Sequence, residues 1–321
     1  MSATDTHPLH RSRTYAFVLA ATLGTVLVSA WGGLSLGSVA FVVLMIFVAV
    51  TGIPHGAIDH LVASEVYGLD QSWRDQAKFY GGYLAVMAAY ALLWVVAPVT
   101  SFTLFLLMTI YHFGQADLAY LKLPSLQAYA AYASRGTFLI GLPIAAFPEI
   151  VSPIFVAIAG VDLMAWPWVV ANQGALVAGL IAQHALLLLG LAAISIPSMR
   201  DLGREMLNTA VLALLLATVH PLVAFAVYFG LWHSLGHILE MLRFFRRRGA
   251  AEPTTISGFY RKATLFTIIS FLGLIGLYVA YQAFGAEEQM IALLFILISV
   301  LTLPHMIIVE AMYQQKKAQP A

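Results

Sequence analysis

Histidines within apolar segments are the residues of this 321-residue chain whose chemistry stands out, and most of its 10 histidines occur there. They lie in short motifs with other polar groups. A polar side chain at membrane depth is costly and usually functional. With zero cysteines, the chain has no thiolate ligand and no cysteine nucleophile. The main motifs are PHGAIDH at 54–60, YHFGQAD at 111–117, WHSLGHILE at 232–240 and LPHMIIVE at 303–310.

The spacing within these motifs predicts which side chains share a helix face. His233 and His237 are four residues apart, so both rings face the same way and can chelate one metal ion. His55 and Asp59 have the same spacing. Glu240 follows His233 by two helical turns and returns to nearly the same face.

A single metal site would therefore draw its imidazoles from three helices. Neutral imidazoles without thiolates suit iron, zinc or copper better than magnesium or calcium. Asp59 and Glu240 are the natural candidates to orient the ring N–H groups. The predicted ligand set is His55, His112, His233 and His237.

Other residues of the motifs leave two interpretations open. Asp117 and His60 are five residues from His112 and His55, which turns them away from the shared target. His184 is predicted to be a hydrogen-bond partner between helices, and His305 either such a partner or a contributor to the site. Tyr111, Phe229 and Trp232 are predicted either to pack between helices or to line a substrate site.

The composition says which solvent surrounds these helices. Apolar residues make up 61% of the chain and charged residues 10%, with a mean hydropathy of +0.87. One soluble domain cannot bury so much apolar surface, so the chain is expected to lie in lipid. This excludes a soluble enzyme, a nucleic-acid binder and a disordered protein. The net charge of +1 implies no polyanionic partner.

Runs of about 20 apolar residues predict an all-α bundle of ten transmembrane helices, with both termini cytoplasmic. In that topology all 16 Lys and Arg residues fall on the cytoplasmic side, although Arg135 lies about two turns inside its helix. Residues 1–13 are predicted as a disordered tail, 14–315 as one transmembrane catalytic domain, 316–321 as a second tail, and 147–166 as a surface or re-entrant piece. The runs are 14–34, 37–64, 76–97, 100–122, 127–146, 167–195, 203–219, 221–246, 258–284 and 287–315.

In their order along the chain, the four motifs resemble those of the bacterial and archaeal Brp/Blh family of β-carotene 15,15′-dioxygenases. The resemblance covers essentially the whole membrane domain. It implies Fe(II)- and O2-dependent cleavage of the central double bond of β-carotene to two all-trans-retinals, which serve rhodopsins. It also implies that His55, His112, His233 and His237 are the iron ligands, and it carries no definite role to Asp59, His60, His305 or Glu310.

The expected setting is the inner cell membrane, with β-carotene and membrane lipid as partners, no nucleic acid, and a functional link to a microbial rhodopsin. A transporter for a metal ion or protons is the alternative, because intramembrane histidines and acids also line such pathways. The similar depth of the histidines speaks against it, since a pathway would stagger polar groups across the membrane. A two-metal lipid desaturase or hydroxylase would want more ligands than one HxxxH spacing supplies.

Overall fold

The computed structural model describes residues 7–10, 12–32, 37–70, 72–194, 198–249, 253–283 and 290–318. Among these described residues no strand occurs, and helices are joined by short turns, which confirms the predicted all-α class. Helices are the expected outcome for apolar runs of this length, because in lipid every backbone N–H and C=O has to be satisfied within its own segment.

The chain divides into two compact units that alternate along the sequence. Unit 1 comprises the described residues of Met1–Val48, Leu106–Val156 and Val161–His237. Unit 2 comprises those of Ala49–Phe105, Ala157–Gly160 and Ile238–Ala321. The predicted motifs are therefore shared out: His112, His233 and His237 belong to unit 1, and the PHGAIDH and LPHMIIVE motifs to unit 2.

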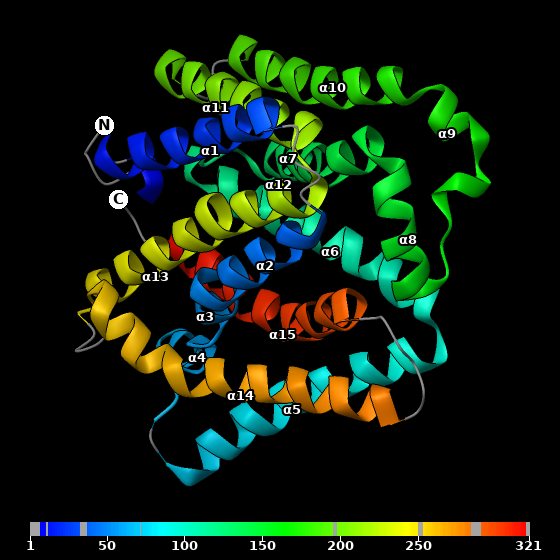
Figure 1. Cartoon of the computed structure of the whole chain (residues 1–321). Coiled ribbons are helices and arrows are strands. Elements are labelled where there is room, and N and C mark those ends of the chain that lie inside the picture. Colours follow the sequence, from blue (N-terminus) through cyan, green and yellow to red (C-terminus); the bar gives the residue numbers. More distant parts are fainter. Residues whose placement is uncertain are drawn as a thin grey trace. The chain divides into compact units, whose positions relative to one another are not determined.

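Unit 1 is a layered helical bundle in which α10 lies along α7 and α11, and α1 lies along α11 (Figure 1). Proline begins several of its helices, as at Pro148, Pro167 and Pro221, where a missing N–H costs nothing. Its elements are η1 (Pro8–His10), α1 (Ser12–Gly32), α2 (Gly37–Phe47), the end of α6 (Pro98–Leu118), η3 (Ala119–Leu121), α7 (Ser125–Ala146), most of α8 (Pro148–Ala159), η4 (Leu163–Ala165), α9 (Pro167–Ala171), α10 (Gln173–Ala193), α11 (Met199–Thr218), α12 (Pro221–Val227), η5 (Tyr228–Ser234) and the start of α13 (Leu235–Arg248).

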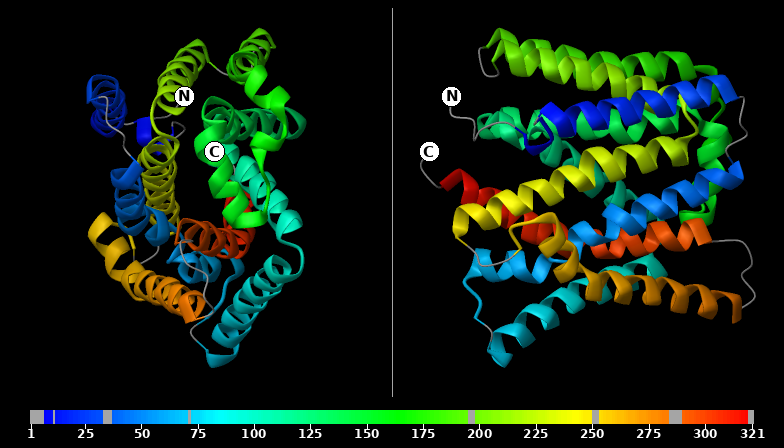
Figure 2. Two further views of the ribbon diagram at one scale, coloured as in Figure 1. Left: turned by 45° about the vertical axis from the view of Figure 1, so that its right-hand side comes forward. Right: turned by 60° about the vertical axis from the view of Figure 1, so that its left-hand side comes forward.

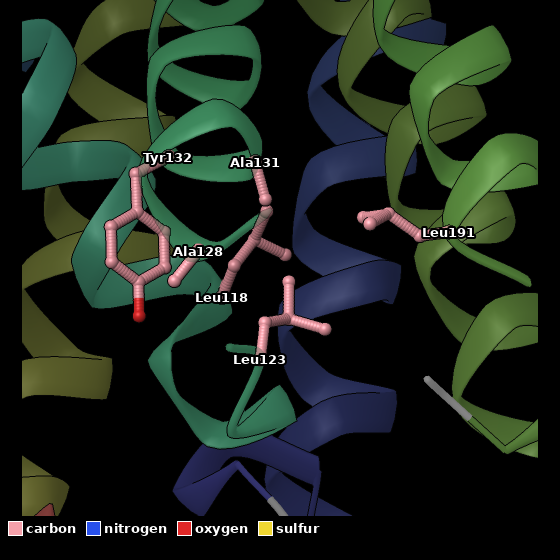
Figure 3. Packing of buried hydrophobic residues seen from close by; sticks show 6 residues of the cluster. All are labelled: Leu118, Leu123, Ala128, Ala131, Tyr132 and Leu191. Carbon is pink, nitrogen blue, oxygen red and sulfur yellow. The ribbon is translucent and has the colours of Figure 1, made fainter. Parts of the chain in front are cut away.

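The helix that carries His112 packs unusually tightly on α7. A Cβ atom at Gly114 would lie 1.9 Å from the carbonyl oxygen of Tyr132, and one at Gly136 would lie 1.8 Å from that of Ile110. Only glycine permits backbones to approach so closely. A buried apolar cluster packs around the turn between the two helices (Figure 3). Its residues are Leu118, Leu123, Ala128, Ala131, Tyr132 and Leu191.

Unit 2 is built around α15, which packs against α4, α5 and α14, while α14 also contacts α3 (Figure 2). Trp94 Nε1 donates to Ser299 Oγ at 2.8 Å and thereby ties α5 to α15. The elements of unit 2 are most of η2 (Val48–Gly52), α3 (Ile53–Gly56), α4 (Asp59–Tyr67), α5 (Trp73–Val96), the start of α6, the end of α8, the rest of α13, α14 (Ile256–Ala283) and α15 (Met290–Ala318).

Seven helical stretches of the described chain are long and apolar enough to cross a membrane. An eighth arises if α7 and α8, bent by 107°, form one broken span. That bend is compatible with the surface or re-entrant piece predicted at 147–166. Helices also form over the runs 100–122 and 203–219, but they are not among the seven, so the count of ten and the side of the termini stay predictions. The seven are Arg13–Trp31, Val39–Tyr67, Trp73–Val96, Gln173–Ala193, Pro221–Arg248, Ile256–Val279 and Met290–Gln315.

The stretch predicted as an N-terminal tail contains a packed turn. In it, His7 is 8% exposed, and its Nε2 lies 3.3 Å from the carbonyl oxygen of Ala116. The His10 ring meets Tyr120 edge-on, with ring centres 5.1 Å apart. Ring contacts rather than an apolar run bury these residues, so hydropathy could not predict the packed turn. Residues 1–6 and 11 lie outside the described residues, as do 319–321 of the predicted second tail.

Candidate metal centre

Three imidazoles come together inside unit 1. They are His112 on α6, His233 in η5 and His237 on α13, and each is at most 3% exposed. The ring centres of His112 and His233 are 4.9 Å apart, and those of His112 and His237 are 6.0 Å apart. His233 and His237 are 6.1 Å apart with their rings within 3° of parallel. The four-residue spacing thus turns both rings the same way.

These separations can be compared with the geometry of a shared ion. Two imidazoles bound to one ion at about 2.1 Å have ring centres about 5 Å apart. The His112–His233 pair meets this value. His237 lies about 1 Å farther from each partner, within reach of a rotation about its side-chain bonds. The trio therefore has the donor chemistry of a metal site, but it is not among the groups of described residues whose ligand atoms all lie within 4.8 Å of one another.

Aromatic rings surround the imidazole of His233. The Phe113 ring centre is 4.4 Å from it, and the Phe229 ring is stacked at 5.8 Å. Phe225 stacks in turn on Phe229 at 5.4 Å. Such an apolar wall excludes water and strengthens electrostatic interactions inside it. Phe229, predicted as a substrate-lining candidate, is part of this wall.

Two of the helical stretches that bear histidines, Val39–Tyr67 and Pro221–Arg248, contain a π-helical segment. η2 ends at Gly52, three residues before His55, and η5 includes His233. π-Helical turns are rare and often occur at functional sites, because the extra residue re-aims the side chains around it. Gly230 of η5 also lets α2 come close, since a Cβ there would lie 2.2 Å from the Phe47 ring. Hydropathy and histidine spacing carry no signal for these segments.

Asp117 is bound by residues of α7 and η5. Arg135 Nε on α7 donates to its Oδ2 at 2.9 Å, and the Tyr228 hydroxyl of η5 donates to its Oδ1 at 3.3 Å. This pairing explains why Arg135 can lie inside a helix at 1% exposure. The carboxylate connects the helix of His112 with the segment of His233.

In unit 2, two further imidazoles face each other. The ring centres of His55 and His305 are 4.9 Å apart, and the rings are nearly perpendicular at 89°. His55 Nδ1 donates to the carbonyl oxygen of Gly52. His305 Nδ1 lies 2.8 Å from Asp59 Oδ1, and the Tyr83 hydroxyl donates to Asp59 Oδ2 at 2.9 Å. Asp59 thus binds the ring of His305, a partner that helix spacing could not reveal.

Other predicted site residues have contacts that packing explains. Trp232 Nε1 donates to Thr22 Oγ1 at 3.0 Å, which joins η5 to α1. Tyr111 accepts from Gln115 Nε2 at 3.1 Å. A role for Trp232 or Tyr111 at the substrate stays a prediction.

Three more polar residues that the sequence analysis considered also contact neighbours. Glu240 forms an ion pair with Arg243 at 3.7 Å. The ring of His60 lies 4.9 Å from that of Phe266. The interpretation of His184 as a hydrogen-bond partner is confirmed, because its Nδ1 lies 3.0 Å from Ser134 Oγ on α7.

Two titratable groups near helix ends, Asp162 and His10, have lowered pKa values. Hydrogen bonds from Ser152 and the backbone of Met164 lower the pKa of Asp162, which caps η4. Burial lowers the pKa of His10 to about 2, with neighbouring His7 as the next cause. His10 is therefore neutral where it packs.

The chain is similar to known proteins over most of its length. The family model described as "Beta-carotene 15,15'-dioxygenase" matches residues 44–313. A "Probable beta-carotene 15,15'-dioxygenase Blh" of Halobacterium salinarum is 29% identical over 312 residues, covering 87% of this chain and 86% of the relative. A "Beta-carotene 15,15'-dioxygenase" of the uncultured marine bacterium 66A03 is 24% identical over 280 residues, covering 84% and 92%. No solved structure gives a significant match.

Proposed function

The chain belongs to the β-carotene 15,15′-dioxygenase family, and we propose that it uses iron and O2 to cleave the central double bond of β-carotene into two all-trans-retinals. Carotenoid cleavage is the activity of the family, and two relatives that share most of the chain bear the enzyme's name. The observation that carries the proposal is the buried imidazole trio of unit 1, which occupies motifs inside the matched region.

The proposed iron site uses imidazole alone. Within unit 1 the separation of His112 and His233 fits a common ion. Within unit 2 the Gly52 carbonyl accepts the Nδ1 proton of His55, which leaves its Nε2 lone pair for a metal. Bound Fe(II) would supply the activation of O2, a chemistry that side chains lack. The proposed ligands are His55, His112, His233 and His237.

The chain's own residues then position the metal ligands and exclude water from the site. Asp117, held by Arg135, fixes η5 through the Tyr228 hydroxyl and so keeps His233 against the helix of His112. Phe113 and Phe229 cover the His233 ring and keep water from the reacting groups. Because the ligands are neutral, loading requires deprotonated imidazoles and should fail in acid.

The substrate fits a protein embedded in lipid. β-Carotene has no polar group and partitions into the bilayer, so a multi-pass protein can take it laterally between helices. β-Carotene has no group that can form a hydrogen bond, so cleavage at its centre depends on how far the substrate extends into an apolar site. We propose the inner cell membrane as the location and retinal supply to a microbial rhodopsin as the purpose.

The test is metal analysis and product analysis on the full chain in detergent. Purified protein should contain close to one iron per chain and convert β-carotene to retinal in air but not without O2. His233→Ala and His237→Ala should lose both metal and product. His184→Ala, a buried histidine bound to Ser134 instead, is the matched control and should retain both. Full activity in metal-free protein would refute the proposal.

A further inference from the structure

His305 has the surroundings of a metal-binding imidazole. We propose that His305 is a further ligand of the metal ion bound by His55, with Asp59 as its positioning residue; this rests on the proposed metal centre. His305 follows Pro304 inside α15 and is 4% exposed. Proline removes one backbone hydrogen bond and bends the helix, which aims the next side chain inward.

The hydrogen bond to Asp59 determines which ring nitrogen of His305 carries the proton. An ionised carboxylate only accepts hydrogen bonds, so Nδ1, 2.8 Å from Asp59 Oδ1, is the protonated nitrogen. Nε2 is then the nitrogen with the lone pair. Metal-binding histidines nearly always donate their second ring N–H to a carboxylate or a carbonyl oxygen in this way.

Asp59 is itself held in place. The Tyr83 hydroxyl of α5 donates to its Oδ2 at 2.9 Å, so each carboxylate oxygen has a different donor. The carboxylate cannot rotate without losing one of these bonds. The arrangement ties α4, α5 and α15 together and leaves the His305 ring one orientation.

The position of His55 completes the argument within unit 2. Its Nδ1 is also bound to an oxygen acceptor, the carbonyl of Gly52, so it too presents Nε2. Each of the two rings offers a nitrogen, and these nitrogens lie within 4.8 Å of each other. The ring centres are 4.9 Å apart, which matches the separation of about 5 Å for two imidazoles on one ion. A purely structural His305–Asp59 bond would require neither the separation nor the matching tautomers.

His305→Asn separates a ligand from a structural partner. The asparagine amide can still donate to Asp59, as Nδ1 does, but nothing replaces Nε2. The measurement is Co²⁺ binding to metal-free protein in detergent, by competition with a chelator and by visible absorption, which reports the number and type of ligands. We expect the Kd to rise at least about tenfold and the spectrum to change. The matched control, His184→Asn, should leave both unchanged.

Asp59→Asn tests the positioning role and serves as the second variant if His305→Asn aggregates. It keeps an acceptor for the ring N–H but removes the charge, so the Kd should rise about tenfold while the spectrum keeps its form, because the ligands are the same. A Kd within about twofold of wild type and an unchanged spectrum, in whichever of the two variants folds, would overturn the proposal.

The wild-type protein distinguishes this failure from failure of the proposed function. If wild type binds one metal ion and releases retinal while His305→Asn binds Co²⁺ normally, His305 is no ligand and the function stands. If wild type and His233→Ala bind equally little metal, both proposals fail.

Discussion

Breaking the Asp117–Arg135 pair is the most direct test of how unit 1 holds its imidazoles. The two side chains are 9% and 1% exposed, and Arg135 Nε lies 2.9 Å from Asp117 Oδ2. Arg135→Met leaves the buried carboxylate with the Tyr228 hydroxyl at 3.3 Å. Removing one member of a buried pair costs about 3–5 kcal/mol, so the unfolding equilibrium constant should rise about 150- to 5000-fold.

The free energy of unfolding can be measured by reversible denaturation in mixed micelles, followed by circular dichroism. Asp117→Leu combined with Arg135→Met should be more stable than Arg135→Met alone, because the Asp117 carboxylate no longer stays buried without its partner. The matched control is Lys78→Met, which breaks an ion pair whose lysine is 76% exposed and should cost less than about 1 kcal/mol. The reasoning is refuted if Arg135→Met costs no more than this control, or if the double variant is the less stable one.

Three further predictions concern packing, acid and metal. Gly114→Ala should destabilise unit 1 by more than about 3 kcal/mol, since its Cβ would overlap the Tyr132 backbone. Gly24→Ala has open space around it and should stabilise α1 by about 0.5–1 kcal/mol, and thermal melts of the two variants test the difference. Since burial lowers the pKa of His10 to about 2, its packing should be strongest above about pH 6.5 and should weaken by up to about 1.4 kcal/mol per pH unit below it. Protease cleavage near residue 10 would report this change, and cleavage that is the same at pH 8 and pH 5 contradicts it. Chelation of the metal should lower the stability of wild type by about 2.7 kcal/mol relative to metal held at one hundred times its Kd, and should leave His233→Ala unchanged; an equal loss in both would count against the site.

Much of this protein could be predicted from composition and local spacing. A chain with 61% apolar residues is expected to lie in lipid, where long apolar runs can satisfy their backbone hydrogen bonds internally as helices. The four-residue interval between His233 and His237 turned both rings the same way because helical periodicity is a local property. The order of motifs along the chain indicated the family.

Contacts between helices distant in sequence were decided only by the tertiary structure. Arg135 lies within a helix because it pairs with Asp117 on another helix. His305 bonds Asp59 across 246 positions of sequence. Which faces meet depends on how closely backbones can approach, as at Gly114, and on π-helical turns that shift the register. Periodicity determines the face on which a side chain lies, but the partner on that face is selected by packing, which is a property of the whole fold.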